Sequence, residues 1–88
     1  MKISEEYVIR EVAGEYIIVP TGKVAINFNG LITVNDTGAF LWKQLQKGAS
    51  KEDLIHAVTA EFEIDEESAA ADIGAFLKKI REEGILEE

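Results

Sequence analysis

The sequence predicts an α+β fold in which short antiparallel strands are followed by three helices. Two observations support this prediction. Up to residue 35 the hydrophobic side chains tend to alternate with polar ones, as in half-buried strands, and after residue 35 they recur at helical spacing. The strand signals all precede the helix signals, which is the order of an α+β domain. Because the chain has 88 residues, no linker and no internal repeat, we expect residues 1–88 to form a single domain.

A β-hairpin is predicted at the start of the chain. The segment "EYVIREV" (6–12) alternates in character, and "EYIIVP" (15–20) is rich in β-branched residues and ends at the only proline. Ala13-Gly14 lies between the two segments and suits a tight turn, because glycine tolerates positive φ.

A second hairpin is predicted from the next two strand-like segments. "KVAINF" (23–28) alternates again, and "LITVN" (31–35) follows it after Asn29-Gly30. Asn-Gly is a strong hairpin signal, since both residues tolerate positive φ. Local pairing therefore predicts that 31–35 lies antiparallel to 23–28, which gives three or four strands in all.

The first helix is predicted to follow directly. Asn35 or Asp36 caps its first turn, and Gly48 ends it. The apolar stripe of this helix consists of Phe40, Leu41 and Leu45, with Trp42 at its edge.

Two further helices complete the pattern. The segment 50–62 opens with Ser-x-x-Asp, which resembles a capping box, and the segment 65–83 has Asp65 as its N-cap and Gly84 at its end. Ile85-Leu86 can then fold back onto the core. The apolar stripe of the second helix is Leu54, Ile55, Val58 and Phe62, and that of the third is Ala69, Ile73, Phe76, Leu77 and Ile80.

Three helices with a β-hairpin follow the winged helix-turn-helix plan, here with the hairpin at the front, but the charge does not suit DNA. The net charge is −8, and residues 50–88 hold twelve acidic and four basic side chains. The third helix begins with Asp65, Glu66 and Glu67, which phosphates would repel. Its basic residues, Lys78, Lys79 and Arg81, lie on the trailing half. We therefore expect no nucleic-acid partner.

No residue pattern predicts catalysis, so we expect no enzyme activity, cofactor or metal. The chain has no cysteine, and its one histidine, His56, has no second ligand at i+3 or i+4. Ser68 lies near a helix start, but "ESA" differs from the Asp-Ser-Leu of acyl carriers. The apolar runs are too short to cross a membrane, and residues 1–15 lack the apolar region of a signal peptide. These features predict a cytoplasmic protein that binds no membrane.

The strand at 31–35 offers a binding function. A strand with open N–H and C=O groups is a template for an extended peptide, or for a second copy of the chain in a homodimer. Pairing on both sides would instead make the strand purely structural. Two functions remain at this point: a peptide-binding domain, and a winged-helix protein-interaction or dimerisation domain.

Several short motifs follow one another along residues 34–86 of the chain. They are Val34-Asn35-Asp36-Thr37-Gly38 at a strand-to-helix junction, Lys47-Gly48 at a helix end, Ser50, Asp53 and Leu54 at the next helix start, Asp72, Ile73, Phe76 and Leu77 in the last helix, and Gly84-Ile85-Leu86 at the close. Their order and spacing resemble the PqqD-like family, small proteins related to the pyrroloquinoline-quinone biosynthesis protein D. The resemblance spans about residues 6–87, and each motif taken alone is degenerate.

This resemblance implies a non-catalytic adaptor that captures the leader of a ribosomally synthesised precursor peptide. It would present the leader to a modifying enzyme, often a radical S-adenosylmethionine enzyme. The leader would add antiparallel to one strand and lie against the third helix. Carried over by position, the peptide-binding residues are Leu31, Ile32, Thr33 and Val34 on the strand and Asp72, Phe76, Lys79 and Glu83 on the helix.

Two features qualify this assignment. Phe76 suits the hydrophobic core equally well. The pyrroloquinoline-quinone protein joins its second and third strands by a short turn, whereas "KVAINFNG" (23–30) intervenes here. A fourth strand in that segment would lie beside 31–35 and compete with a peptide for its edge.

Overall fold

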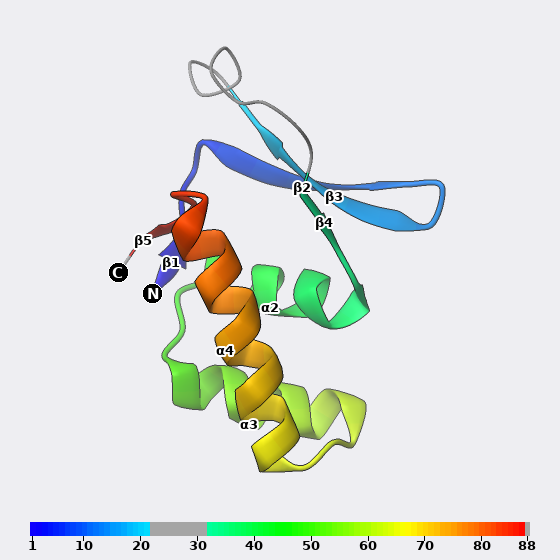
Figure 1. Ribbon diagram of the computed structural model, residues 1–88, viewed down its shortest axis with the longest axis vertical. Helices are drawn as coiled ribbons and strands as arrows, with labels where there is room; N and C mark the ends of the chain where they lie inside the picture. The colour runs from blue at the N-terminus through cyan, green and yellow to red at the C-terminus, as the bar shows by residue number, and fades with distance from the viewer. Residues whose placement is uncertain (22–31, 88) are drawn as a thin grey trace.

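The computed structural model describes residues 1–21 and 32–87, and it shows short strands followed by three helices (Figure 1). The α+β class predicted from the sequence is confirmed. The elements, in chain order, are β1 (Lys2–Ile3), β2 (Tyr7–Val12), β3 (Glu15–Pro20), β4 (Ile32–Val34), α2 (Asp36–Gln46), α3 (Lys51–Phe62), α4 (Glu66–Glu82) and β5 (Leu86–Glu87).

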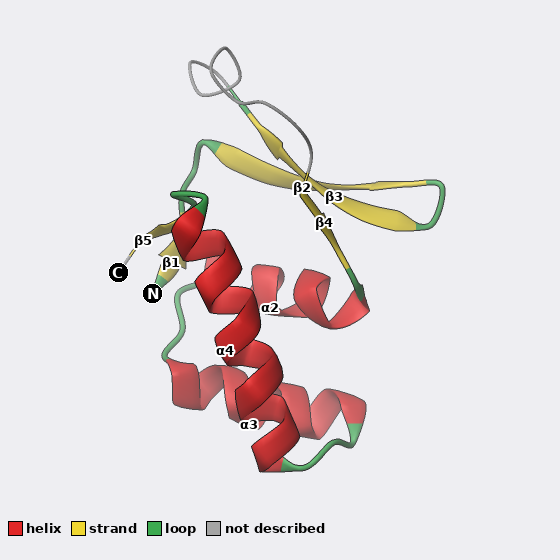
Figure 2. Cartoon of the chain, in the orientation of Figure 1, coloured by secondary structure: helices red, strands yellow, loops and turns green. Residues whose placement is uncertain are grey.

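Strands β2, β3 and β4 form an antiparallel sheet in that order. The predicted turn between β2 and β3 is confirmed, with Ala13 at φ 52° and Gly14 at φ 82°. The tip of this hairpin projects beyond the helices (Figure 2). The buried side chains of this sheet, Tyr7, Ile18 and Ile32, belong to the core cluster, whereas residues 11–15 at the hairpin tip are exposed. The hairpin therefore extends the domain as a wing.

β4 pairs with β3, a contact that the local turn signals do not predict. Thr33 lies opposite Ile17, and Ile32 lies opposite Ile18. Ile18 is fully buried and Ile32 is 7% exposed, so this long-range pairing is stabilised by burial in the core. The predicted partner, 23–28, and the Asn-Gly turn lie outside the described residues, so their pairing stays a prediction. Among the strands that are described, β4 is one edge of the sheet.

A second, two-stranded sheet brings the first and last described residues together. β1 pairs antiparallel with β5, with Ile3 opposite Leu86. The N–H of Ser4 donates to the carbonyl of Ile85 at 2.8 Å. Ile85 is fully buried, which confirms the predicted fold-back of this segment, although the strand pairing itself is not predicted from the sequence.

Local sequence signals fix where α2 and α4 begin and end. Asn35 caps α2, because its Oδ1 accepts a hydrogen bond from the N–H of Gly38 at 2.8 Å. Gly48 (φ 87°) and Gly84 (φ 74°) follow the last turns of α2 and α4. These boundaries agree with the prediction.

The N-termini of α3 and α4 are capped by carboxylates and hydroxyls, also as predicted. Ser50 and Asp53 form a capping box, in which each side chain accepts a hydrogen bond from the other's backbone N–H. Hydrogen bonds that the Asp53 carboxylate accepts from Ser50, from the backbone N–H first and from the hydroxyl second, lower the pKa of Asp53. Hydrogen bonds from the hydroxyl and the N–H of Ser68 lower the pKa of Asp65, the cap of α4.

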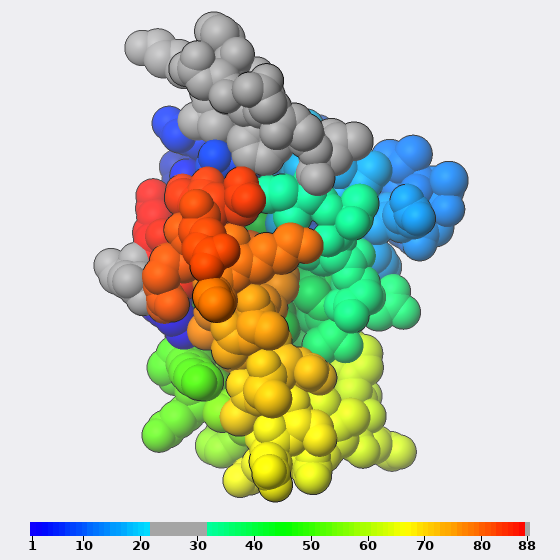
Figure 3. Space-filling model, in the orientation of Figure 1, coloured from blue at the N-terminus to red at the C-terminus, as the bar shows by residue number. Residues whose placement is uncertain are grey.

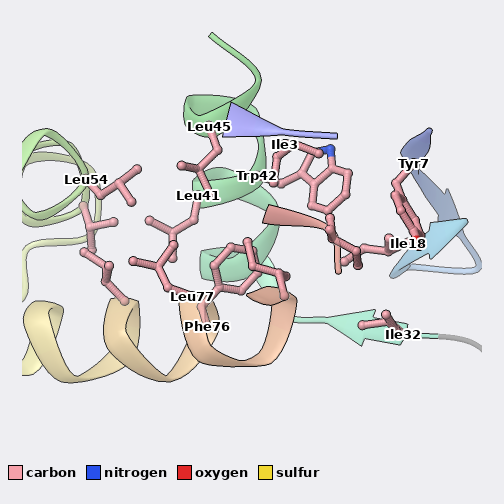
Figure 4. Packing of buried hydrophobic residues seen from close by; sticks show 14 of the residues in the cluster. Ile3, Tyr7, Ile18, Ile32, Leu41, Trp42, Leu45, Leu54, Phe76 and Leu77 are labelled. Carbon is pink, nitrogen blue, oxygen red and sulfur yellow. The ribbon is translucent and has the colours of Figure 1, made fainter. Parts of the chain in front are cut away.

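The core lies between the helices and the two sheets (Figure 4). All five predicted stripe residues of α4 are buried. Trp42 departs from the prediction: it is fully buried instead of lying at the edge of the α2 stripe. The reason is that α2 also packs against β1 at one end of the chain, so its apolar face is wider than one stripe. The indole Nε1 has no hydrogen-bond partner among the described residues.

Candidate functional site

A groove lies between the edge strand β4, the start of α2 and the second half of α4. Its volume is about 370 Å³, and it is open to solvent on one side. In the space-filling view α4 (orange) lies directly beside β4 and α2 (green) (Figure 3). The groove, called the β4–α4 groove below, is lined by Thr33, Val34, Asn35, Thr37, Gly38, Leu41, Asp72, Ala75, Phe76 and Lys79.

The junction between β4 and α2 depends on Gly38. A Cβ atom at this position would lie 2.9 Å from Val34 Cβ and 3.4 Å from Phe76 Cε1, and the first of these distances is too short for two carbon atoms. The absent side chain therefore lets α2 start directly against β4 and α4. The Asn35 cap acts at the same place, because it turns the chain from strand to helix within one residue.

The α4 side of the groove comes from helical spacing. Asp72, Phe76 and Lys79 are separated by four and three residues, so they lie along one face of the helix. Phe76 is 9% exposed and Leu41 is 1% exposed, so the floor of the groove is also the surface of the core. Asp72 and Lys79 are exposed and carry opposite charges at the two ends of this face.

Lys79 links the helix to the strand. Its Nζ donates a hydrogen bond to the carbonyl oxygen of Thr33 at 3.2 Å. The side chain of Lys79 therefore reaches across the groove to the main chain of β4.

The structure brings together five of the eight residues that the resemblance implied. Thr33 and Val34 of β4 line the groove on one side, and Asp72, Phe76 and Lys79 of α4 line it on the other. Ile32 belongs to the core, where it is 7% exposed, and Glu83 is an exposed residue at the C-terminal cap of α4; neither lines the groove. Leu31 lies outside the described residues.

Sequence reasoning missed the other half of the lining. The missed residues are Asn35, Thr37, Gly38, Leu41 and Ala75. One of them had a usable signal: Ala75 lies three residues after Asp72 and four before Lys79, which places it on the same helical face. Asn35, Thr37 and Gly38 belong to a motif of the family resemblance, but neither that motif nor helical spacing indicates that they or Leu41 line the groove. Their place in it depends on how the start of α2 packs against α4.

The residues considered for other functions lie elsewhere. His56 is exposed on α3, and the Ser68 hydroxyl interacts with the Asp65 cap. Within residues 1–21 and 32–87 no group of three or more His, Cys, Asp or Glu side chains is arranged to hold a metal ion. Over the same residues, no helix is long and apolar enough to cross a membrane.

Comparison with known proteins identifies the family. The sequence matches the family model "Coenzyme PQQ synthesis protein D (PqqD)" over residues 15–86. The chain belongs to the PqqD family. The match covers both sides of the β4–α4 groove, so the strand edge and the helical face that form it are part of the PqqD unit.

Two solved structures share the fold of this PqqD chain. The first, "TbiB1 in Complex with the TbiA(beta) Leader Peptide", has a TM-score of 0.77 and 23% sequence identity, and the alignment covers 99% of this chain and 95% of that chain. The second, "Lasso peptide synthetase B1 complexed with the leader peptide", has a TM-score of 0.73 and 23% identity, with 96% and 93% covered. A search of curated protein sequences gives no significant match.

Proposed function

We propose that this PqqD-family chain is a peptide-binding adaptor that captures the leader of a ribosomally synthesised precursor peptide by strand addition at β4. It then presents the peptide to a modifying enzyme, for which a radical S-adenosylmethionine enzyme is our first candidate. The observation that carries the proposal is the groove that runs along the edge of β4. Family membership supports it, as do the two structures of the same fold, each of which is a complex with a leader peptide.

Strand addition explains how a site with a small contact area can bind a peptide. The main chain of an extended peptide would pair with the N–H and C=O groups of β4, which supplies affinity for any sequence. Side chains on alternate residues of the peptide would then point into the groove, because strand side chains alternate between faces. The apolar floor formed by Phe76, Leu41 and Val34 suits a hydrophobic side chain there.

In this proposal the chain supplies binding and the partner enzyme supplies the chemistry. The groove is lined by one carboxylate, one ammonium group and otherwise neutral side chains. A substrate positioned on it would still be exposed along its outer side, where an enzyme can approach. The chain itself then needs no catalytic residue and no cofactor, and it works in the cytoplasm, where precursor peptides are made.

The electrostatics argue against nucleic acid as the ligand. The first turn of α4, which would lead a recognition helix into DNA, presents Glu66 and Glu67 to solvent. Phosphate groups would be repelled there. The acidic surface does not oppose a peptide that brings its own mixture of charges.

The test uses a bulky side chain to fill the groove. Ala75 lines the groove and is exposed, whereas Ala71, one turn earlier on α4, is exposed and lies outside the lining. Short linear peptides selected from a randomised library on the wild-type chain serve as the probe. We expect Ala75→Trp to weaken their binding at least tenfold and Ala71→Trp to leave it within twofold. Equal affinity of these peptides for wild type and both variants would overturn the proposal.

A further inference from the structure

The hydrogen bond between Lys79 and Thr33 occupies part of the edge that a peptide would use. The accepting group is a main-chain carbonyl of β4, and the donor comes from the neighbouring helix rather than from β3. In an antiparallel ladder, successive residues direct their N–H and C=O groups alternately to the two sides of the strand. The bond to Lys79 therefore indicates that Thr33 turns both its carbonyl and its N–H away from β3, toward α4.

A strand that adds to β4 must take over this carbonyl. Its own N–H would donate to Thr33, because Thr33 is the central residue of β4 and directs both polar groups to that edge. Lys79 then loses its acceptor. The Lys79 ammonium group gains more from a hydrogen bond to a carboxylate than from a hydrogen bond to a neutral acceptor.

We propose that Lys79 is a specificity-determining residue that exchanges the Thr33 carbonyl for a carboxylate of the bound peptide. The inference rests on the proposed function and adds to it the class of peptide that is preferred. Peptides with an acidic residue in register with Lys79 bind better than neutral ones, because they provide a new partner for the displaced ammonium group.

The groove also sets where that acidic residue lies. The space left by Gly38 brings Phe76 close to Val34, whereas Lys79, one turn further along α4, reaches Thr33. The helix therefore runs in the opposite direction to β4 along the groove. The described strand pairs of this sheet are antiparallel. A peptide that adds to β4 in the same way runs in the same direction as α4.

The register follows from strand alternation. The peptide residue that pairs with Thr33 points to the outer face of the sheet, as the Thr33 side chain does, and the residues on either side of it point into the groove. The residue before it meets Val34 and Phe76, and the residue after it meets Lys79. The preferred peptide thus has an apolar residue followed, two positions later, by Asp or Glu. Asp72 lies at the other end of the helical face, and its negative charge disfavours an acidic residue toward the N-terminal end of the bound peptide.

The experiment compares Lys79→Gln with Lys78→Gln, which removes the same charge from the adjacent exposed position of α4. Peptides are selected on the wild-type chain from a randomised linear library, and one with the expected acidic residue is also made with Glu replaced by Gln. The Glu-to-Gln change should weaken binding to wild type and to Lys78→Gln about threefold, the size of an exposed ion pair. It should have no effect on binding to Lys79→Gln, which should bind the Gln peptide at least as tightly as wild type does.

An equal loss in all three proteins would overturn the role of Lys79, as would selected peptides that show no acidic preference. Amide chemical shifts separate this failure from a failure of the proposed function. If the shifts of Ile32–Val34 change on binding while Lys79→Gln has no specific effect, strand addition stands and the exchange does not. If the bound peptides leave those shifts unchanged, the docking site itself is wrong.

Discussion

Replacing Gly38 with alanine should destabilise the protein, whereas the same change at Gly74 should stabilise it. Both glycines lie in helices, where alanine is ordinarily more favourable by about 0.5–1 kcal/mol. At Gly74 the nearest atom to a new Cβ is the flexible Lys51 Nζ at 4.0 Å, so this gain should be realised. At Gly38 the new Cβ would lie 2.9 Å from Val34 Cβ.

That contact cannot be relieved by rotating a side chain, because the Cβ of Val34 moves only with the backbone of β4. Overpacking of this kind costs about 1–3 kcal/mol. Offset by the helix propensity of alanine, the net effect of Gly38→Ala is a loss of about 1 kcal/mol, and the two variants should differ by about 2 kcal/mol.

Urea unfolding followed by Trp42 fluorescence measures this difference, since Trp42 is fully buried and will report the exposure of the core. Gly38→Ala should also shift the amide resonances of β4, because the strand must move to admit the methyl group. A Gly38→Ala variant that is as stable as Gly74→Ala, with the amide resonances of β4 unchanged, would refute the close-approach role of Gly38.

Further changes test the caps and the core. Asn35→Ala should cost about 1 kcal/mol in urea unfolding, because it removes the cap of α2; no loss would contradict that role. Ile85→Ala should cost about 2–4 kcal/mol, whereas Val12→Ala, at a position that is 56% exposed, should stay within about 0.5 kcal/mol. The pKa values of Asp53 and Asp65 are lowered in the folded state, so their stabilisation is present at neutral pH and is lost as the pH falls below 3.8. The wild type should therefore lose more stability on acidification than the doubly substituted Asp53→Asn, Asp65→Asn protein, and parallel acid-unfolding curves would contradict this.

Features that depend on a few neighbouring residues could be predicted from the sequence. The N-caps at Asn35, Ser50 and Asp65 could be predicted, because each of these side chains can accept a hydrogen bond from the backbone N–H three residues later. The buried face of α4 follows from its helical period, whereas Asp72, Phe76 and Lys79 were indicated as site residues by the family resemblance.

Features that depend on distant segments could not be predicted. The pairing of β4 with β3 is selected by the burial of Ile18 against Ile32, and no local turn signal encodes it. The pairing of β1 with β5 joins segments of two residues each, which are too short to show a period. The helical pattern predicts Trp42 at the edge of a stripe, because the pattern of one helix carries no information about what packs on its other side; in the fold Trp42 is fully buried.

The candidate site shows the same division. The strand pattern indicates the β4 edge and the family resemblance supplies the residues of the helical half, but the role of Gly38 needed the distance to Val34. The Lys79–Thr33 bond joins residues 46 positions apart, so it is visible only in the fold. That bond also supplied the register from which a peptide preference could be inferred.

The central claim is that a peptide adds as a strand to β4 and lies in the β4–α4 groove. Its most direct test is the set of backbone amide shifts of the isotope-labelled chain during titration with a library-selected peptide. We predict that the largest changes fall in Ile32–Val34 and along the α4 face that carries Asp72, Ala75, Phe76 and Lys79. Changes confined to β2 and β3, with β4 and this face of α4 unaffected, would contradict it.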